Sequence, residues 1–292
     1  MLPHSRAGAR DSPNRGTPFR PPAHRPRMDG SATGERGSAA DGSPPPGTDP
    51  GSGSASGIRN ADPVRCAREL LDAIPTGGEV EQRLAALAAT DDAALAPLRE
   101  ERATALAFWL NLCNAGTQLL LDRRPELYER ALRTVRFFRA ETVTVAGTPL
   151  SLNDIEHGIL RGSMSMVGLG YLPRLRPGAF ERRYRLEPVD PRIHFALNCG
   201  AASCPPIRHY EPDRVDEQLD LATRGYLEST VEYDEDAGIV GVPRVFLWYR
   251  GDFGGGSGIR EFLREYGAVP ERAKPRIRHR SRDWTREPGK FE

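Results

Sequence analysis

The sequence predicts an α+β fold, with one mainly helical domain over about residues 61–292 and a small antiparallel or mixed sheet. Apolar residues recur at helical spacing in several segments, whereas alternating or β-branched runs are short and few. With 38% hydrophobic and 28% charged residues over 292 positions, the chain also has the composition of an ordinary globular protein. These observations favour helices packed around a core, with strands in a minor role.

Residues 1–57 differ in composition from the rest of the chain. They consist mainly of Pro, Gly, Ser, Ala and Arg, and Leu2 and Phe19 are almost the only large apolar side chains. Such a segment cannot bury enough apolar surface to offset the entropy that is lost on ordering. We therefore predict that residues 1–57 form a disordered tail.

The first ordered elements are predicted to be helices. Asp62-Pro63 combines an N-cap residue with proline at the first helical position, and apolar residues follow at helical spacing to Ile74. A second helix is predicted over residues 79–89. A third, over about residues 101–122, is apolar on nearly every side, so we expect it in the middle of the domain.

The central helix carries one narrow polar stripe, formed by Thr104, Asn111, Asn114 and Gln118. A buried amide group without a partner costs about 1–3 kcal/mol, so these side chains must be satisfied by other groups. Two interpretations stay open: the stripe ties neighbouring loops to the helix, or it lines a cleft.

The middle of the chain is predicted to hold short strands and one short helix. Residues 137–140 and 142–145 indicate a strand pair, or a strand and a turn. Ser151 with an acid three residues later begins a helix that places Asn153, His157 and Arg161 in one row. Residues 164–189 are rich in Gly, Pro and Arg and indicate a long loop.

Residues 190–206 contain the most informative pattern of the chain. Ile193, Phe195 and Leu197 alternate with His194, Ala196 and Asn198, which predicts a strand over residues 193–198. A loop of small residues with Cys199 and Cys204 follows, and Pro205-Pro206 stops a helix or central strand from continuing. We therefore expect His194, Cys199 and Cys204 to lie close together.

The C-terminal part alternates helices with short strands. Helices are predicted over about residues 213–230, from Pro243 onward, and over residues 259–266 behind a glycine run in which Ser257 is the cap. A hairpin is expected between residues 231–233 and 239–242. Arginines alternate with other residues over 276–282, which is typical of an exposed edge strand.

Charge and cysteine content narrow the class of protein. The net charge is +1, and residues 61–292 hold 33 basic against 35 acidic residues, which argues against a nucleic-acid partner. No apolar run approaches the ~18 residues of a membrane span, so no membrane partner is predicted. Four cysteines in 292 residues are few, and Cys66 and Cys113 fall among apolar helical residues. This indicates a reducing compartment, and we expect a cytoplasmic protein.

Four sequence blocks occur together in a recognisable order: Phe108–Ala115, Leu152–Arg161, Asp190–Pro206 and Trp248–Phe253. With these blocks, residues 105–266 resemble the domain of unknown function 547 family. The resemblance singles out Trp109, Asn111, Asn114, Glu156, His157, Arg161, His194, Cys199 and Cys204, and it implies no particular activity.

One prediction from these residues is thiol chemistry. A reactive thiolate needs a base or cation beside it and a third group that orients the base. We assign Cys199 as the nucleophile and His157 or His194 as the base. The orienting group is predicted among Asn111, Asn114 and Glu156, and substrate contacts among Trp109, Arg161 and Cys204. The expected function is a thiol-dependent hydrolase or acyl transferase that acts on a small molecule or peptide without a cofactor.

Two other hypotheses stay open. His194, Cys199, Cys204 and His209 follow one another at five-residue intervals and include the ligand types of a tetrahedral zinc site, although zinc loops usually space cysteines more closely. In the other hypothesis the cysteines are buried small apolar residues and the histidines belong to a polar network. The protein is then a scaffold or binding module without catalysis.

Overall fold

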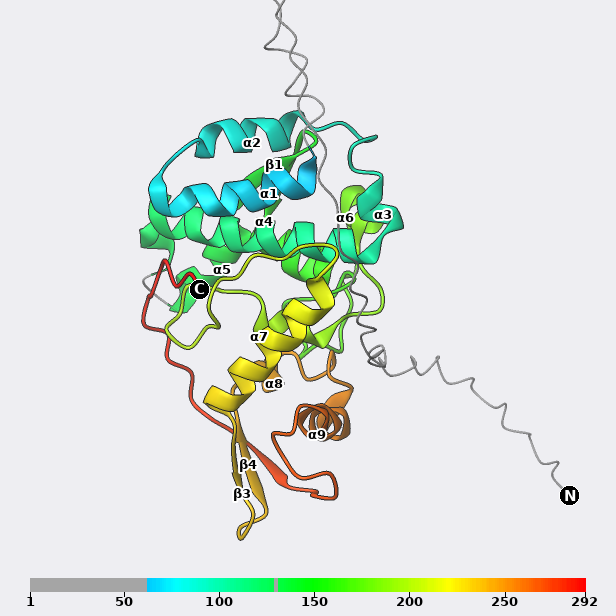
Figure 1. The fold of residues 1–292 in the computed structure, drawn as a ribbon, viewed down its shortest axis with the longest axis vertical. Coiled ribbons are helices and arrows are strands. Elements are labelled where there is room, and N and C mark those ends of the chain that lie inside the picture. The colour runs from blue at the N-terminus through cyan, green and yellow to red at the C-terminus, as the bar shows by residue number, and fades with distance from the viewer. Residues whose placement is uncertain (1–61, 129–130) are drawn as a thin grey trace, which may run out of the picture. The chain divides into compact units, whose positions relative to one another are not determined.

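A computed structural model describes residues 62–128 and 131–292, and the predicted tail over residues 1–57 lies outside this range. The described residues belong to the compact unit that spans residues 48–292. They form helices and two small sheets (Figure 1), so the predicted α+β class with a mainly helical content is confirmed.

The elements are as follows. The α-helices are α1 Pro63–Ala73, α2 Val80–Ala89, α3 Pro97–Glu100, α4 Arg102–Arg123, α5 Ala131–Arg139, α6 Ala179–Tyr184, α7 Val215–Thr230, α8 Val245–Trp248 and α9 Gly255–Glu265. The 3₁₀ turns are η1 Ile74–Thr76, η2 Pro125–Leu127 and η4 Pro191–Phe195, and η3 Asp154–Leu160 is a π-helix. The strands are β1 Glu141–Val145, β2 Thr148–Ser151, β3 Glu232–Asp234, β4 Ile239–Val242 and β5 Arg276–His279.

Helix α4 lies in the larger of two hydrophobic clusters, as its apolar sequence predicts. Helices α1 and α2 lie beside each other, and α1 packs along α4 (Figure 1). Almost every side chain from Thr104 to Leu121 is buried. At the start of α1 the predicted cap is present, because the Asp62 carboxylate accepts a hydrogen bond from Val64 N at 3.0 Å.

The sheets are small and lie at different places in the sequence. Strands β1 and β2 form an antiparallel hairpin that contacts α2. Strands β3 and β4 form the second predicted hairpin, and β5 pairs in parallel with β4. This makes a mixed three-stranded sheet with β5 at its edge, as the alternating arginines predict.

The smaller hydrophobic cluster is built mainly by the C-terminal elements. It contains Val240 and Val242 of β4, Phe246 of α8, and Phe262 and Leu263 of α9. Phe195, the last residue of η4, belongs to this cluster, whereas Ile193 and Ala196 belong to the larger one. The segment around η4 therefore joins the two clusters.

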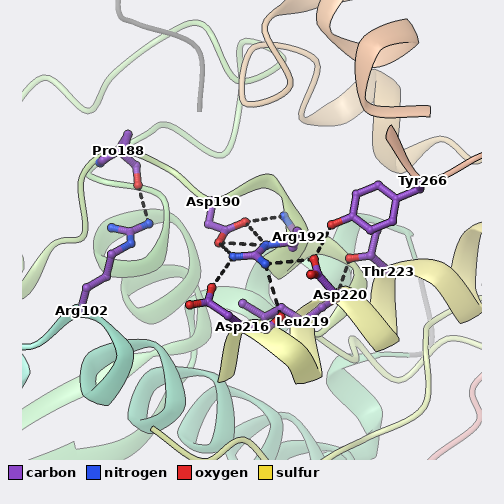
Figure 2. Close-up of polar contacts among 9 residues, drawn as sticks. All are labelled: Arg102, Pro188, Asp190, Arg192, Asp216, Leu219, Asp220, Thr223 and Tyr266. Atoms are coloured by element: carbon purple, nitrogen blue, oxygen red, sulfur yellow. Dashed lines mark hydrogen bonds and ion pairs between the residues drawn. The ribbon is translucent and has the colours of Figure 1, made fainter. Parts of the chain in front are cut away.

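The prediction of a strand over residues 193–198 is wrong, because Pro191–Phe195 forms the 3₁₀ turn η4. Figure 2 shows the cause, which is a network of ion pairs around Arg192. Its buried guanidinium contacts Asp190 at 2.7 Å, and Asp216 and Asp220 of α7 at 2.7 and 3.0 Å. The Asp190 carboxylate also accepts the Arg192 backbone N–H, so tertiary contacts fix a tight turn where the apolar alternation alone favours a strand.

Three further local predictions are wrong. Residues 137–139 end helix α5, where Phe137 packs against Tyr128 with 5.4 Å between ring centroids. The predicted loop over residues 164–189 contains α6, whose Tyr184 lies 6.2 Å from Trp109. Helix α9 begins at Gly255 behind Gly254, so Ser257 lies inside the helix and is not its cap.

Candidate functional site

A cavity of about 210 Å³ lies between the two hydrophobic clusters. Its wall includes Glu156 and His157 of η3, His194 of η4, and Cys199 in the following loop. Four of the predicted site residues, from two distant segments, therefore line one hollow. The remaining wall is mostly apolar: Cys113, Val135, Phe138, Met166, Leu197, Pro205, Val245, Trp248 and Trp284, with Thr117, Asn198, Tyr226, Tyr249 and Arg282.

The local sequence explains why η3 presents its side chains here. The Ser151 hydroxyl donates to the Asp154 carboxylate at 2.6 Å and accepts from Asp154 N, as the predicted start of a helix requires. The helix then widens, because Arg161 N bonds to Glu156 O, five residues earlier. Such wide turns recur at functional sites in proteins.

His194 is held by Asp252, the residue to which the sequence assigned no role. His194 Nε2 lies 2.8 Å from Asp252 Oδ2, and both side chains are almost fully buried. Burial raises the pKa of Asp252, but hydrogen bonds from His194 and Arg161 outweigh burial and lower this pKa to about 2. The ionised carboxylate can only accept, so Nε2 of His194 carries the proton. In the neutral ring, Nδ1 is then the atom with a free lone pair.

His157 also carries its proton on Nε2, but here the lone pair of Nδ1 is the engaged group, because its partner is a cation. Arg161 Nη1 lies 2.6 Å from His157 Nδ1, and a guanidinium has only donors, so Nδ1 accepts and Nε2 carries the proton. Burial lowers the pKa of His157 to about 4, and the charge of Arg161 adds to this effect. At neutral pH His157 is therefore an uncharged ring with a fixed N–H donor.

Arg161 and Tyr249 complete this polar network. Arg161 forms two hydrogen bonds with the Asp252 carboxylate, at 2.6 and 2.9 Å, and is fully buried. Tyr249 stacks on the His194 ring with 3.8 Å between centroids and donates its hydroxyl to Glu156 Oε1 at 2.5 Å. The two imidazoles are thus held at fixed positions by charged and aromatic neighbours.

The two sulfurs of the following loop share one cation. Arg282 Nη2 lies 2.8 Å from Cys199 Sγ and 3.0 Å from Cys204 Sγ. Cys199 is partly exposed, whereas Cys204 is buried. All four cysteines within the described ranges are free thiols. Among the hydrogen bonds of residues 62–128 and 131–292, none joins an imidazole to either sulfur.

Other predicted site residues lie away from the cavity wall. Asn111 and Asn114 are fully buried and use both amide atoms on backbone: Asn111 bonds Tyr210 O and N, and Asn114 bonds Ala196 O and Asn198 N. Trp109 is enclosed by aromatic rings. The two asparagines therefore tie loops to the central helix, and Trp109 fills the core.

The ligand set considered for zinc does not come together. His194 pairs with Asp252, and the His209 imidazole lies 3.2 Å from Asp72. In the part of the chain that the structure describes, no group of three or more His, Cys, Asp or Glu side chains is arranged to hold a metal ion.

A model of the family described as protein of unknown function, DUF547, matches residues 98–227. We call this stretch the DUF547 region, after the family model that it matches. The resemblance predicted from the sequence blocks is confirmed, although the match ends before the block Trp248–Phe253. Comparisons with curated proteins and with solved structures found no match. Over the two described ranges, none of the helices has the length and apolar character needed to cross a membrane.

The DUF547 region supplies only part of the candidate site, which consists of the cavity wall and the side chains that hold it. Glu156, His157, His194 and Cys199 lie within it, whereas Tyr249, Asp252 and Arg282 come from the chain that follows. Tyr249 and Asp252 stand in the block Trp248–Phe253, whose resemblance to the family is visible in the sequence. Arg282 gave no such signal, because its alternation with neighbouring residues is the pattern of a solvated strand.

Proposed function

We propose that the DUF547 region and the chain that follows it form a thiol-dependent acyl hydrolase or acyl transferase. The observation that carries the proposal is that Cys199 shares a cavity with an imidazole whose tautomer is fixed by a buried carboxylate. This arrangement has the three parts that nucleophilic catalysis needs, namely a nucleophile, a base and a group that orients the base.

The proposed first half-reaction forms an acyl-cysteine. The Cys199 sulfur attacks the carbonyl carbon of an ester, thioester or amide, and its proton passes to Nδ1 of His194. The imidazolium then returns this proton to the departing alcohol, thiol or amine as the carbonyl re-forms. Asp252 keeps the His194 ring in the required tautomer, and the N–H of His157 can donate to the carbonyl oxygen.

In the second half-reaction the acyl group leaves the enzyme. A water molecule, or another nucleophile in the case of a transferase, attacks the thioester while His194 takes its proton. The proton then passes to the Cys199 sulfur as the carbon–sulfur bond breaks. Each half-reaction restores the histidine, so no cofactor is required.

The wall of the cavity indicates the kind of acyl group. Val135 and Trp284 are 44% and 46% exposed, so the entrance itself is apolar. Phe138, Met166 and Trp248 add further apolar side chains to the wall. We infer that the acyl group is aliphatic or aromatic and uncharged.

The test uses the full chain and p-nitrophenyl esters of increasing aliphatic chain length. We expect hydrolysis that passes through an acyl-cysteine visible by mass spectrometry on Cys199. Cys199→Ala is expected to abolish the acyl adduct, and His194→Gln to slow hydrolysis by about 10²-fold or more. Cys66→Ala is the matched control and leaves the rate unchanged, because Cys66 lies in the core away from the cavity. Unchanged hydrolysis in Cys199→Ala would overturn the proposal.

One observation favours a second candidate, a binding module without turnover. In the described part of the chain, the hydrogen-bond partners of the Cys199 and Cys204 sulfurs are Arg282, the Cys199 backbone N–H and each other, and none is an imidazole. An apolar ligand could then occupy the cavity without reacting. Binding of a non-hydrolysable aliphatic ketone that is equally tight in wild type and Cys199→Ala, with no ester hydrolysis in either, would favour this alternative.

A further inference from the structure

Cys199 and Cys204 lie at the two ends of one tight turn. Cys204 N bonds to Ala201 O at 2.9 Å, which closes the turn, and Cys199 N donates to Cys204 Sγ at 3.1 Å. Gly200 has a φ of +82°, a conformation that favours glycine. The backbone of this turn therefore brings the second cysteine back onto the first.

Arg282 shows that the two sulfurs are neighbours. Its Nη2 atom lies 2.8 Å from the Cys199 sulfur and 3.0 Å from the Cys204 sulfur. The two sulfurs are therefore less than about 6 Å apart. The guanidinium itself lies against a pair of neighbouring indole rings, with its central carbon 5.2 Å from the centroid of Trp248 and 4.8 Å from that of Trp284. The cation is thus held against both sulfurs.

The charge of Arg282 favours one negative charge on this pair. Burial raises the pKa of the Cys204 thiol, but the hydrogen bond from Cys199 and the charge of Arg282 outweigh burial and lower it. The same hydrogen bond raises the pKa of Cys199. The pair therefore gives up its first proton readily and holds the second tightly, with the remaining proton between the two sulfurs.

We propose that Cys199 and Cys204 are a redox pair that forms a reversible disulfide with a low-molecular-weight disulfide as the oxidant. The proton shared by the pair moves to the Cys204 sulfur as the Cys199 sulfur, which is the partly exposed one, attacks one sulfur of the oxidant and releases the other as a thiolate. The Cys204 sulfur then attacks Cys199 in this mixed disulfide and releases the second thiolate, which takes the Cys204 proton. The first thiolate takes from water the proton that the pair had released earlier, so two electrons pass to the oxidant.

Formation of the disulfide does not depend on the proposed catalysis, but its consequence does rest on the proposed function. Oxidation removes the nucleophile from the cavity, so the acyl transfer proposed above stops until a dithiol reduces the pair. The cavity thiol is then active only in reducing conditions. This adds a redox requirement that the imidazoles and the carboxylate alone do not predict.

The test is incubation of the full chain with glutathione disulfide, followed by intact-mass analysis and peptide mapping. We expect loss of the mass of two hydrogen atoms, a bridge between Cys199 and Cys204, and full recovery on reduction with dithiothreitol. Cys66→Ala with Cys113→Ala is the matched control, because it leaves only the pair and is expected to form the same bridge. In Cys204→Ser, glutathione is expected to stay attached to Cys199, since no second thiol can displace it.

A second variant tests the part assigned to the cation. Arg282→Gln removes the charge beside both sulfurs, so bridge formation at neutral pH is expected to slow by about tenfold, and the pH at which the rate rises shifts upward. A bridge to Cys66 or Cys113, or a wild type that keeps glutathione on Cys199, would overturn the proposal. The bridge is detected by mass and not by activity. A protein without esterase activity can therefore still form the bridge, and a protein without the bridge can still hydrolyse esters, so the two proposals can fail separately.

Discussion

At the scale of single residues, Asp252 determines what its two neighbours can do. One buried carboxylate accepts from His194 and from Arg161, and Arg161 in turn donates to His157. The two imidazoles therefore have the same Nε2–H tautomer, but this chain of contacts engages the N–H of His194 and the lone pair of His157. His194 keeps a lone pair at Nδ1, whereas His157 keeps an N–H at Nε2, so one ring is suited to accept a proton and the other to donate a hydrogen bond.

The low pKa of His157 predicts a loss of stability in mild acid. In the unfolded chain an imidazole titrates near pH 6.5, whereas burial lowers the pKa of His157 to about 4 in the fold. Between these values the unfolded state binds a proton that the folded state does not. The free energy of unfolding is therefore expected to fall by about 2 kcal/mol from pH 7 to pH 5, measured by urea denaturation.

The matched variant for this prediction is His157→Gln, which has no titrating ring. Between pH 7 and pH 5 its free energy of unfolding is expected to fall less than that of the wild type, and the difference is expected to be about 2 kcal/mol, the amount assigned to His157. Asp252 does not interfere with this measurement. Its pKa is lowered to about 2 in the fold, so its contribution to the free energy of unfolding is lost only as the pH falls below about 4. Equal pH slopes in wild type and variant would contradict the assignment.

At the scale of elements, the sequence predicts helices better than it predicts the segment that carries the site. Helix α1 follows from its cap and apolar spacing, helix α4 from its nearly continuous apolar sequence, and the hairpin of β3 and β4 from its turn. The turn η4 does not, because the contacts that fix it come from Asp216 and Asp220 on α7, more than twenty residues away. Alternation over a few residues contains no information about such distant partners.

Gly200 connects this element to the reactive loop, and its replacement makes the second prediction. At a φ of +82° an alanine is strained, and its Cβ would lie 2.5 Å from Leu121 Cδ1. Gly200→Ala is expected to lower the free energy of unfolding by about 1–3 kcal/mol and to disturb the pairing of Cys199 with Cys204. Urea denaturation and the yield of the disulfide measure the two effects.

Gly225→Ala is the control for this substitution. Gly225 is exposed on helix α7, and a Cβ there meets nothing within 4 Å. Alanine has the higher helix propensity, so this variant is expected to be more stable by about 0.5–1 kcal/mol and to form the disulfide normally. A Gly200→Ala protein as stable as wild type would show that the turn does not require the glycine.

At the scale of the whole molecule, the candidate site is assembled where two hydrophobic clusters meet. That His157, His194 and Cys199 come together could be expected from the sequence, because they stand in blocks whose order is recognisable. It could not place Arg282, since an arginine in an alternating run is typical of a solvated strand. Its position follows only from the path of the C-terminal segment, which brings this residue back to the sulfurs through long-range contacts.

The central helix reaches this site through Asn114, which leads to the last prediction. Its amide bonds Ala196 O and Asn198 N, the backbone directly before Cys199, whereas Asn111 makes the corresponding bonds to Tyr210. Replacing either residue by alanine leaves two buried backbone groups without partners, so each variant is expected to lose about 2–4 kcal/mol of stability. Only Asn114→Ala is expected to release the Cys199 backbone as well.

We therefore expect the rate of alkylation of Cys199 by iodoacetamide to change in Asn114→Ala and to stay at the wild-type value in Asn111→Ala. Peptide mass spectrometry measures this rate in conditions where both variants are folded. If the two variants alter the alkylation rate equally, the helix supports the loop only through general stability and the specific connection from Asn114 to the cysteine loop is wrong.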